Sequence, residues 1–153
     1  MANTYTQLYV HYDFAVQDRL CLINHKWQDN LYRNMSGIID QQGHKLYVIN
    51  RMNDHIHILI SMTPKQAPSD LMYHLKRSSS LWINHNRLSF GKFSWQEVFG
   101  AFSVGKSQLS EKIKYIEEQQ QHHKKASFRG EYLHFLKEYD IEYDERYIFT
   151  PIE

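Results

Sequence analysis

Residues 55–61 read His55-Ile56-His57-Ile58-Leu59-Ile60-Ser61, an aliphatic run that carries two histidines. A short run of this composition predicts a β-strand, and residues two apart on a strand point to the same side. Both imidazoles therefore leave one face of a sheet side by side, where neutral ring nitrogens can act as metal ligands. A strand with polar residues on its solvent face is the alternative, because a chain with 10 histidines contains such pairs by chance.

The sequence on either side of this strand alternates strand and helix patterns. Its periodicities predict strands at 5–14, 45–50 and 55–61 and helices at 20–39 and about 70–86. Residues 93–104 read as one or two strands with a bulge at Gly100, and helices follow at 107–125 and 128–139. This order predicts an α+β fold, in which an antiparallel sheet carries helices mainly on one face. The other face is then left for the histidines and a ligand.

Length and composition limit the function classes. At 153 residues and 42% hydrophobic content, the chain is expected to form one domain over 1–153, with an acidic and aromatic tail from about 141 to 153 that packs on the body or on a partner. A formal charge of +1 excludes binding by blanket phosphate neutralisation, so contact with nucleic acid requires a local basic patch. The aromatic content of 14% leaves rings for stacking on bases, or for a half-exposed core.

The cysteine count and the first ten residues bear on the cellular compartment and on membrane insertion. Cys21 is the only cysteine, which rules out an intrachain disulfide and fits a reducing cytoplasm. The first ten residues have neither a basic segment nor a long apolar run, so we expect no signal peptide and no membrane helix. The sequence therefore predicts a cytoplasmic protein without a membrane partner.

The helix expected at 107–125 presents a second set of reactive groups. Its apolar stripe consists of Leu109, Ile113 and Ile116, and Tyr115 lies well off that stripe. Gln119 is four residues further on and shares the face of Tyr115. A phenol can act as a nucleophile and an amide oxygen as a metal ligand, and a His-His-Gln set with open positions suits Mg²⁺ or Mn²⁺ beside a phosphate. A surface tyrosine on an amphipathic helix is the alternative.

Several segments in the same order resemble the single-tyrosine transposases of the insertion-sequence 200/605 family. Residues 53–61 resemble that family's histidine-hydrophobe-histidine strand. The other segments that carry the resemblance are Thr6-Gln7-Leu8-Tyr9-Val10-His11, Leu75-Lys76-Arg77-Ser78-Ser79-Ser80, Trp95-Gln96, Gly100-Ala101-Phe102-Ser103-Val104, and Tyr115-Ile116-Glu117-Glu118-Gln119 with His122-His123 after it. The resemblance covers nearly the full chain.

The resemblance implies a ferredoxin- or RRM-like sandwich and a transposase that cuts and rejoins single-stranded DNA. It implies that His55, His57 and Gln119 bind Mg²⁺ or Mn²⁺ and that Tyr115 forms a 5′-phosphotyrosine intermediate. It also implies a homodimer with composite active sites, in which the tyrosine helix can dock on the partner's histidine pair. The sequence leaves open whether this helix docks in cis or in trans. The DNA partner is then the single-stranded ends of the element, recognised as small hairpins.

Further residues are interpreted as DNA contacts or as positioning groups. Lys76, Arg77 and Lys112 are expected at DNA phosphates, with Ser78 and Ser79 adding hydrogen bonds. A solvated helix face is the alternative for these charges. Asp54 either orients a ligating histidine or forms a turn.

Three other classes of protein remain to be separated from a transposase. A histidine-triad hydrolase requires a third histidine at the next alternate strand position. This chain has Leu59 there, which argues against that class. A non-catalytic binder of single-stranded nucleic acid, or a decayed transposase, would bind DNA without covalent capture. A structural metal protein would show neither DNA capture nor strand transfer.

Overall fold

The computed structural model describes residues 4–119 and 127–150. Their helices and strands are, in chain order, β1 (Tyr9–Val16), α1 (Gln28–Gln41), β2 (Lys45–Arg51), β3 (His55–Ser61), α2 (Pro68–His85), β4 (Trp95–Val104), α3 (Leu109–Glu117) and α5 (Phe128–Glu138). Short 3-10 helices lie at Arg19–Cys21, Lys106–Gln108 and Glu145–Tyr147.

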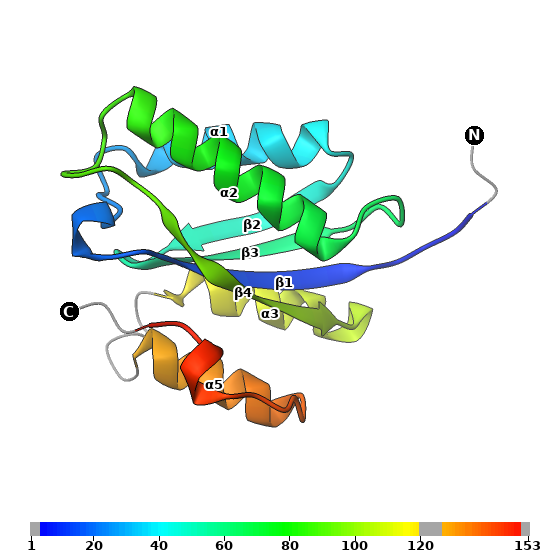
Figure 1. Ribbon diagram of the computed structural model, residues 1–153. Helices are drawn as coiled ribbons and strands as arrows, with labels where there is room; N and C mark the ends of the chain where they lie inside the picture. The colour runs from blue at the N-terminus through cyan, green and yellow to red at the C-terminus, as the bar shows by residue number, and fades with distance from the viewer. Residues whose placement is uncertain (1–3, 120–126, 151–153) are drawn as a thin grey trace.

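The strands form a four-stranded sheet in the order β2-β3-β1-β4, and every neighbouring pair is antiparallel. With α1 and α2 as the two crossovers, this is the β-α-β-β-α-β arrangement of ferredoxin-like folds. The predicted α+β class is confirmed. Helices cover both faces, however, rather than mainly one: α1 and α2 lie on one side, and α3 and α5 lie on the other (Figure 1).

Strand register sorts the central residues between the two faces. His57 pairs with Asp13, and Asp13 pairs on its other side with Gly100, so these three residues form a row across β3, β1 and β4. Because side chains alternate, the isoleucines of β3 (Ile56, Ile58 and Ile60) face the opposite way and pack in the core with α1 and α2, whereas Leu59 shares the face of the histidines and packs with Ile116 of α3. The histidines therefore lie on the face covered by α3 and α5.

Helix α1 begins later than the sequence predicts. The predicted helix starts at residue 20, whereas Arg19–Cys21 forms a 3-10 turn capped by Asp18 and the α-helix starts at Gln28. The Asn24 side chain accepts a hydrogen bond from the backbone N–H of Lys26, which favours a turn in place of helix. The apolar spacing that predicted helix here reflects core contacts of a loop, since Ile23 is fully buried.

The bulge predicted at Gly100 is at a different place. The register shift in the β1–β4 pairing falls between Phe14 and Val16, and Gly100 pairs regularly with Asp13. Gly100 instead makes room for α5, because a Cβ atom at this position would lie 2.6 Å from Cε1 of Tyr132. The glycine thus reports a close approach of a helix to the sheet.

The C-terminal part of the described chain holds α5 against the sheet. Ser127 caps α5 by accepting a hydrogen bond from the N–H of Gly130. Beyond α5 the chain returns to the body, where Phe149 packs on Phe128 and Tyr132 at ring separations of 4.7 and 4.6 Å. Within residues 4–119 and 127–150, no helix combines the length and apolar character needed to cross a bilayer.

Candidate active site

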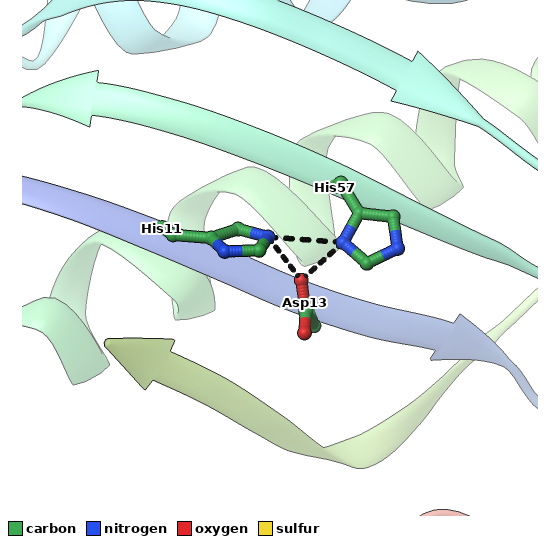
Figure 2. Close-up of side chains that lie close together, drawn as sticks. All are labelled: His11, Asp13 and His57. Atoms are coloured by element: carbon green, nitrogen blue, oxygen red, sulfur yellow. Dashed lines mark hydrogen bonds and ion pairs between the residues drawn. The ribbon is translucent and has the colours of Figure 1, made fainter. Parts of the chain in front are cut away.

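The site is built on the histidines of β3 and the acid beside them on β1. The side chain of Asp13 is fully buried, and its Oδ1 lies 2.5 Å from Nδ1 of His57 and 2.7 Å from Nε2 of His11 (Figure 2). Both ring nitrogens can donate to this carboxylate. Because Nδ1 of His57 is committed to Asp13, its Nε2 is directed toward the helices that cover the sheet.

The surroundings of the buried pair His57 and Asp13 favour the ionised form of each side chain. Burial lowers the pKa of His57, but the carboxylates of Asp13 and Glu131 outweigh that effect and raise it to about 10. Burial raises the pKa of Asp13, but His11 and His57 outweigh it and hold this pKa well below its usual range. The fold therefore keeps a carboxylate permanently behind the ring of His57.

His55 is held by contacts of a similar kind. Its Nδ1 lies 2.6 Å from Oδ1 of Asp54, which agrees with the interpretation of Asp54 as an orienting residue. The ring of Phe128 stacks on its face, with centroids 3.9 Å apart and planes 17° from parallel. The rings of His55 and His57 lie 5.0 Å apart, so both imidazoles have fixed orientations in one buried space.

The helix that follows β4 brings a phenol and an amide to the same place. The hydroxyl of Tyr115 donates a hydrogen bond to Oε2 of Glu131, and Nε2 of Gln119 lies 3.3 Å from that oxygen. The other carboxylate oxygen of Glu131 lies 3.1 Å from Nε2 of His57. The structure therefore gathers His57, Tyr115 and Gln119 around one carboxylate, within a single chain.

Contacts with the edge of the sheet fix the C-terminal end of α3. The side-chain amide of Asn50 donates to the carbonyl oxygens of Ile116 and Glu117, at 2.8 and 3.2 Å.

Burial, followed by the hydrogen bond to Glu131, raises the pKa of Tyr115 well above its usual value. The phenol is therefore protonated in this arrangement.

The residues present fit a divalent cation. His55, His57 and Glu131 are all buried, and each offers a ligand atom within 4.8 Å of the others. In addition, Oε1 of Gln119 is buried without a hydrogen-bond partner in the described part of the chain, as an amide oxygen awaiting a ligand would be. Two imidazole nitrogens with carboxylate and amide oxygens form a donor set suited to Mn²⁺ or Mg²⁺.

The predicted DNA contacts are distributed over two parts of the molecule. Lys112 lies near the site, with its Nζ 5.8 Å from the ring centre of Tyr115. The other four predicted residues are in α2, across the sheet from Tyr115: Arg77 and Ser78 are exposed, whereas Lys76 is half-buried and Ser79 is buried.

The contacts of Lys76 and Ser79 connect α2 to β4. Nζ of Lys76 donates to the carbonyl oxygens of residues 96, 97 and 98, at 2.8 to 3.0 Å. The hydroxyl of Ser79 accepts a hydrogen bond from the indole N–H of Trp95 at 3.0 Å. Both side chains therefore have structural partners, and a role for them at DNA stays a prediction. His122 and His123 lie outside the described residues.

Two acids of the site were not predicted from the sequence. Asp13 is two residues from His11 in a predicted strand, and this same-face spacing of an acid and a histidine is a signal that could have found it. Glu131 gives no such signal, because a glutamate in an amphipathic helix is most often solvated. Only the docking of α5 brings Glu131 to the histidines.

Comparisons with known proteins show the family and agree with this fold. Residues 4–119 match the sequence model of the family described as "Transposase IS200 like". The chain belongs to this family of transposases. A curated relative, the ISDra2 transposase TnpA of Deinococcus radiodurans, is 28% identical over 118 residues that cover 74% of this chain and 84% of that protein.

Solved structures share the fold. A crystal structure described as a transposase from Deinococcus radiodurans superposes with a TM-score of 0.62 at 22% identity, over 78% of this chain and 95% of that one. A REP-associated tyrosine transposase bound to a REP hairpin gives a TM-score of 0.61 at 10% identity, over 80% of this chain and 73% of that one. Helix α5 lies beyond the segment that matches the family.

Proposed function

We propose that this transposase cuts and rejoins single-stranded DNA through a covalent intermediate on Tyr115. One observation carries the proposal: the phenol of Tyr115, the amide of Gln119 and Nε2 of His57 meet at the carboxylate of Glu131, although His57 is distant in sequence from the other three residues. A nucleophile beside a set of metal ligands is the arrangement that phosphoryl transfer requires.

The reaction exchanges one phosphodiester for another. The oxygen of Tyr115 attacks the scissile phosphorus and loses its proton, the bond from phosphorus to the 3′ oxygen breaks, and that oxygen leaves as a 3′-hydroxyl after gaining a proton. The downstream strand is then attached to the enzyme as a 5′-phosphotyrosine. A different 3′-hydroxyl attacks this bond, which rejoins the DNA and restores the phenol. Because each step replaces one ester by another, no ATP is needed.

The residues of the chain have distinct roles in this proposal. His55, His57 and Gln119 would hold Mg²⁺ or Mn²⁺, which would supply positive charge to polarise the phosphate and to favour loss of the phenol proton. Asp13 fixes the orientation of His57 so that Nε2 is presented to the ion. Asp54 does the same for His55 through its Nδ1.

The proposed substrate is the single-stranded end of a mobile element. The net charge of +1 argues against tight binding of long DNA by charge alone, so recognition depends on local contacts with a folded strand such as a hairpin. The fold shared with a transposase that is bound to a DNA hairpin supports this choice. Arg77, Ser78 and Lys112 are the proposed contacts, the first two exposed on α2 and the third beside Tyr115.

Covalent trapping tests the proposal. We would incubate the chain and Mn²⁺ with 3′-labelled single-stranded oligonucleotides from the DNA that flanks its coding sequence, and separate the products on a denaturing gel. We expect a labelled protein band that disappears with EDTA and in Tyr115→Phe. The control variant Tyr147→Phe removes an exposed hydroxyl and should keep the band.

Two results would contradict the proposal. An undiminished band in Tyr115→Phe would assign the nucleophile to another residue. Binding of these oligonucleotides without any covalent band would instead indicate a non-catalytic binder or a decayed transposase.

A further inference from the structure

Glu131 is the acid at the centre of the site, and it comes from an element that the family match does not include. It lies in the first turn of α5 and is 8% exposed. Its two oxygens contact His57 on one side and Tyr115 and Gln119 on the other. This buried carboxylate is paired with His57 in the metal-free chain, so its charge lies at the ring that the proposed function assigns to the cation.

The position of Glu131 is fixed by the packing of α5. Phe128, three residues earlier, stacks on the ring of His55. Tyr132, the next residue, packs over the space that Gly100 leaves on β4. Because aromatic contacts on both sides seat this turn of α5, the carboxylate is held at the histidines by the helix itself and not by a mobile surface side chain.

The charge and geometry of the site favour a carboxylate ligand. His55, His57 and Gln119 are neutral donors when they bind an ion, so a divalent cation held by them alone would keep its full charge in a buried place. Glu131 offers a ligand atom within 4.8 Å of those of His55 and His57. A carboxylate is the hard oxygen ligand that Mg²⁺ and Mn²⁺ prefer, and it neutralises half of their charge.

We propose that Glu131 is a further protein ligand of the divalent cation in the DNA-free chain. This inference rests on the proposed function, since it takes the ion to lie at His55 and His57. It predicts that part of the affinity for the metal comes from α5, outside the segment shared with the family.

Binding of Mn²⁺ alone tests this without any DNA or activity. We would titrate the full chain with MnCl₂ and follow the signal of unbound Mn²⁺ by electron paramagnetic resonance. Glu131→Gln keeps the shape and removes the charge, and we expect its Kd to be at least about 10-fold weaker than that of the wild type. Glu138→Gln makes the same change at an exposed position of α5 and should bind as the wild type does.

A second readout separates a ligand from a residue that only supports the fold. Loss of a protein ligand leaves a coordination position to water, so Mn²⁺ bound to Glu131→Gln should carry one more water molecule. That water is detected as extra line broadening in ¹⁷O-labelled water.

If circular dichroism shows that Glu131→Gln does not fold, Glu131→Asp takes its place. This variant draws the carboxylate back by one methylene, and we again expect weaker binding of Mn²⁺.

The outcomes distinguish this inference from the proposed function. Wild-type affinity and hydration in Glu131→Gln, together with weakened binding in His57→Gln, would overturn the role of Glu131 and leave the metal site intact. No binding of Mn²⁺ by the wild-type chain would overturn both this inference and the metal-dependent reaction.

Discussion

Asp13 shows how a single buried acid sets the chemistry of its neighbours. It occupies Nδ1 of His57 and Nε2 of His11, and thereby determines which nitrogen of His57 faces Glu131. Without this partner, a fully buried imidazole would favour its neutral form. The pair therefore couples the stability of the chain to pH.

The pKa shifts of His57 and Asp13 determine whether the stability of the chain rises or falls with pH. The pKa of His57 is raised from 6.5 to about 10, so its stabilising contribution is fully present below pH 6.5 and is lost as the pH rises toward 10. The pKa of Asp13 is lowered, so its contribution is present above its usual pKa of 3.8 and is lost in stronger acid. In EDTA, we expect the melting temperature to fall between pH 6.5 and 9.

Two variants check this prediction by thermal denaturation. Asp13→Asn removes the main cause of the raised pKa and should show a smaller fall over the same pH range. His134→Gln changes a histidine whose side chain is 75% exposed and should keep the wild-type slope. A wild-type melting temperature that stays constant or rises from pH 6.5 to 9 would show that His57 is not held in its charged form.

At the residue scale, strand alternation predicted that His55 and His57 share one face, and helical spacing predicted that Tyr115 and Gln119 share another, because local periodicity decides both. That the two pairs meet at one site was a hypothesis from their chemistry and from the family resemblance, since local periodicity does not say which elements pack together. The proximity of Glu131 was not predictable in this way. It depends on how α5 docks, and the contacts that seat this helix, Tyr132 at Gly100 and Phe128 on His55, join elements that are far apart in the sequence.

At the scale of elements, the sequence predicted the strands well and the helix boundaries less well. Strands β2 and β3 lie within one residue of the predicted ranges, and the aliphatic run that predicted β3 is buried along nearly its whole length. The first helix was predicted eight residues too early because loop residues that enter the core, such as Ile23, imitate helical spacing. Helices on the second face were unforeseen because the histidine face was expected to lie open.

Gly100 tests whether α5 is seated on the sheet as described. In Gly100→Ala, the new methyl group would meet the ring of Tyr132 at 2.6 Å and that of Phe102 at 3.0 Å. We expect a loss of about 1–3 kcal/mol in the free energy of unfolding, because overpacking of this kind shifts rings that have little space to move. Urea denaturation followed by circular dichroism measures this loss.

Gly37→Ala is the matched control, because Gly37 lies on the exposed side of α1 with no atom within 4 Å of the added Cβ. Alanine in the middle of a helix should stabilise the chain by roughly 0.5–1 kcal/mol. If both variants were equally stable, α5 would not approach β4 as closely as the structure shows.

At the scale of the whole molecule, one chain contains every group of the proposed site. The family resemblance implies a homodimer with composite sites, and that remains a prediction. The hydrogen bonds from Asn50 to the end of α3 and the docking of α5 instead hold Tyr115 beside the histidines of its own chain. We therefore expect the site to work in cis.

Mixing two inactive variants distinguishes these arrangements. Tyr115→Phe lacks the nucleophile and His57→Gln lacks a metal ligand, so a mixture should remain inactive in the trapping assay if each site is formed within one chain. A covalent band that appears only after mixing would show that the tyrosine helix of one chain serves the histidines of another.

In the proposed reaction, Tyr115 becomes covalently attached to the 5′ phosphate of DNA. Peptide mass spectrometry on the wild-type protein tests this most directly: the trapped adduct is digested with nuclease and protease, and the residue that keeps the nucleotide is identified among the 11 tyrosines of the chain. We expect a single modified residue, Tyr115. Attachment to any other residue, with Tyr115 unmodified, would contradict it.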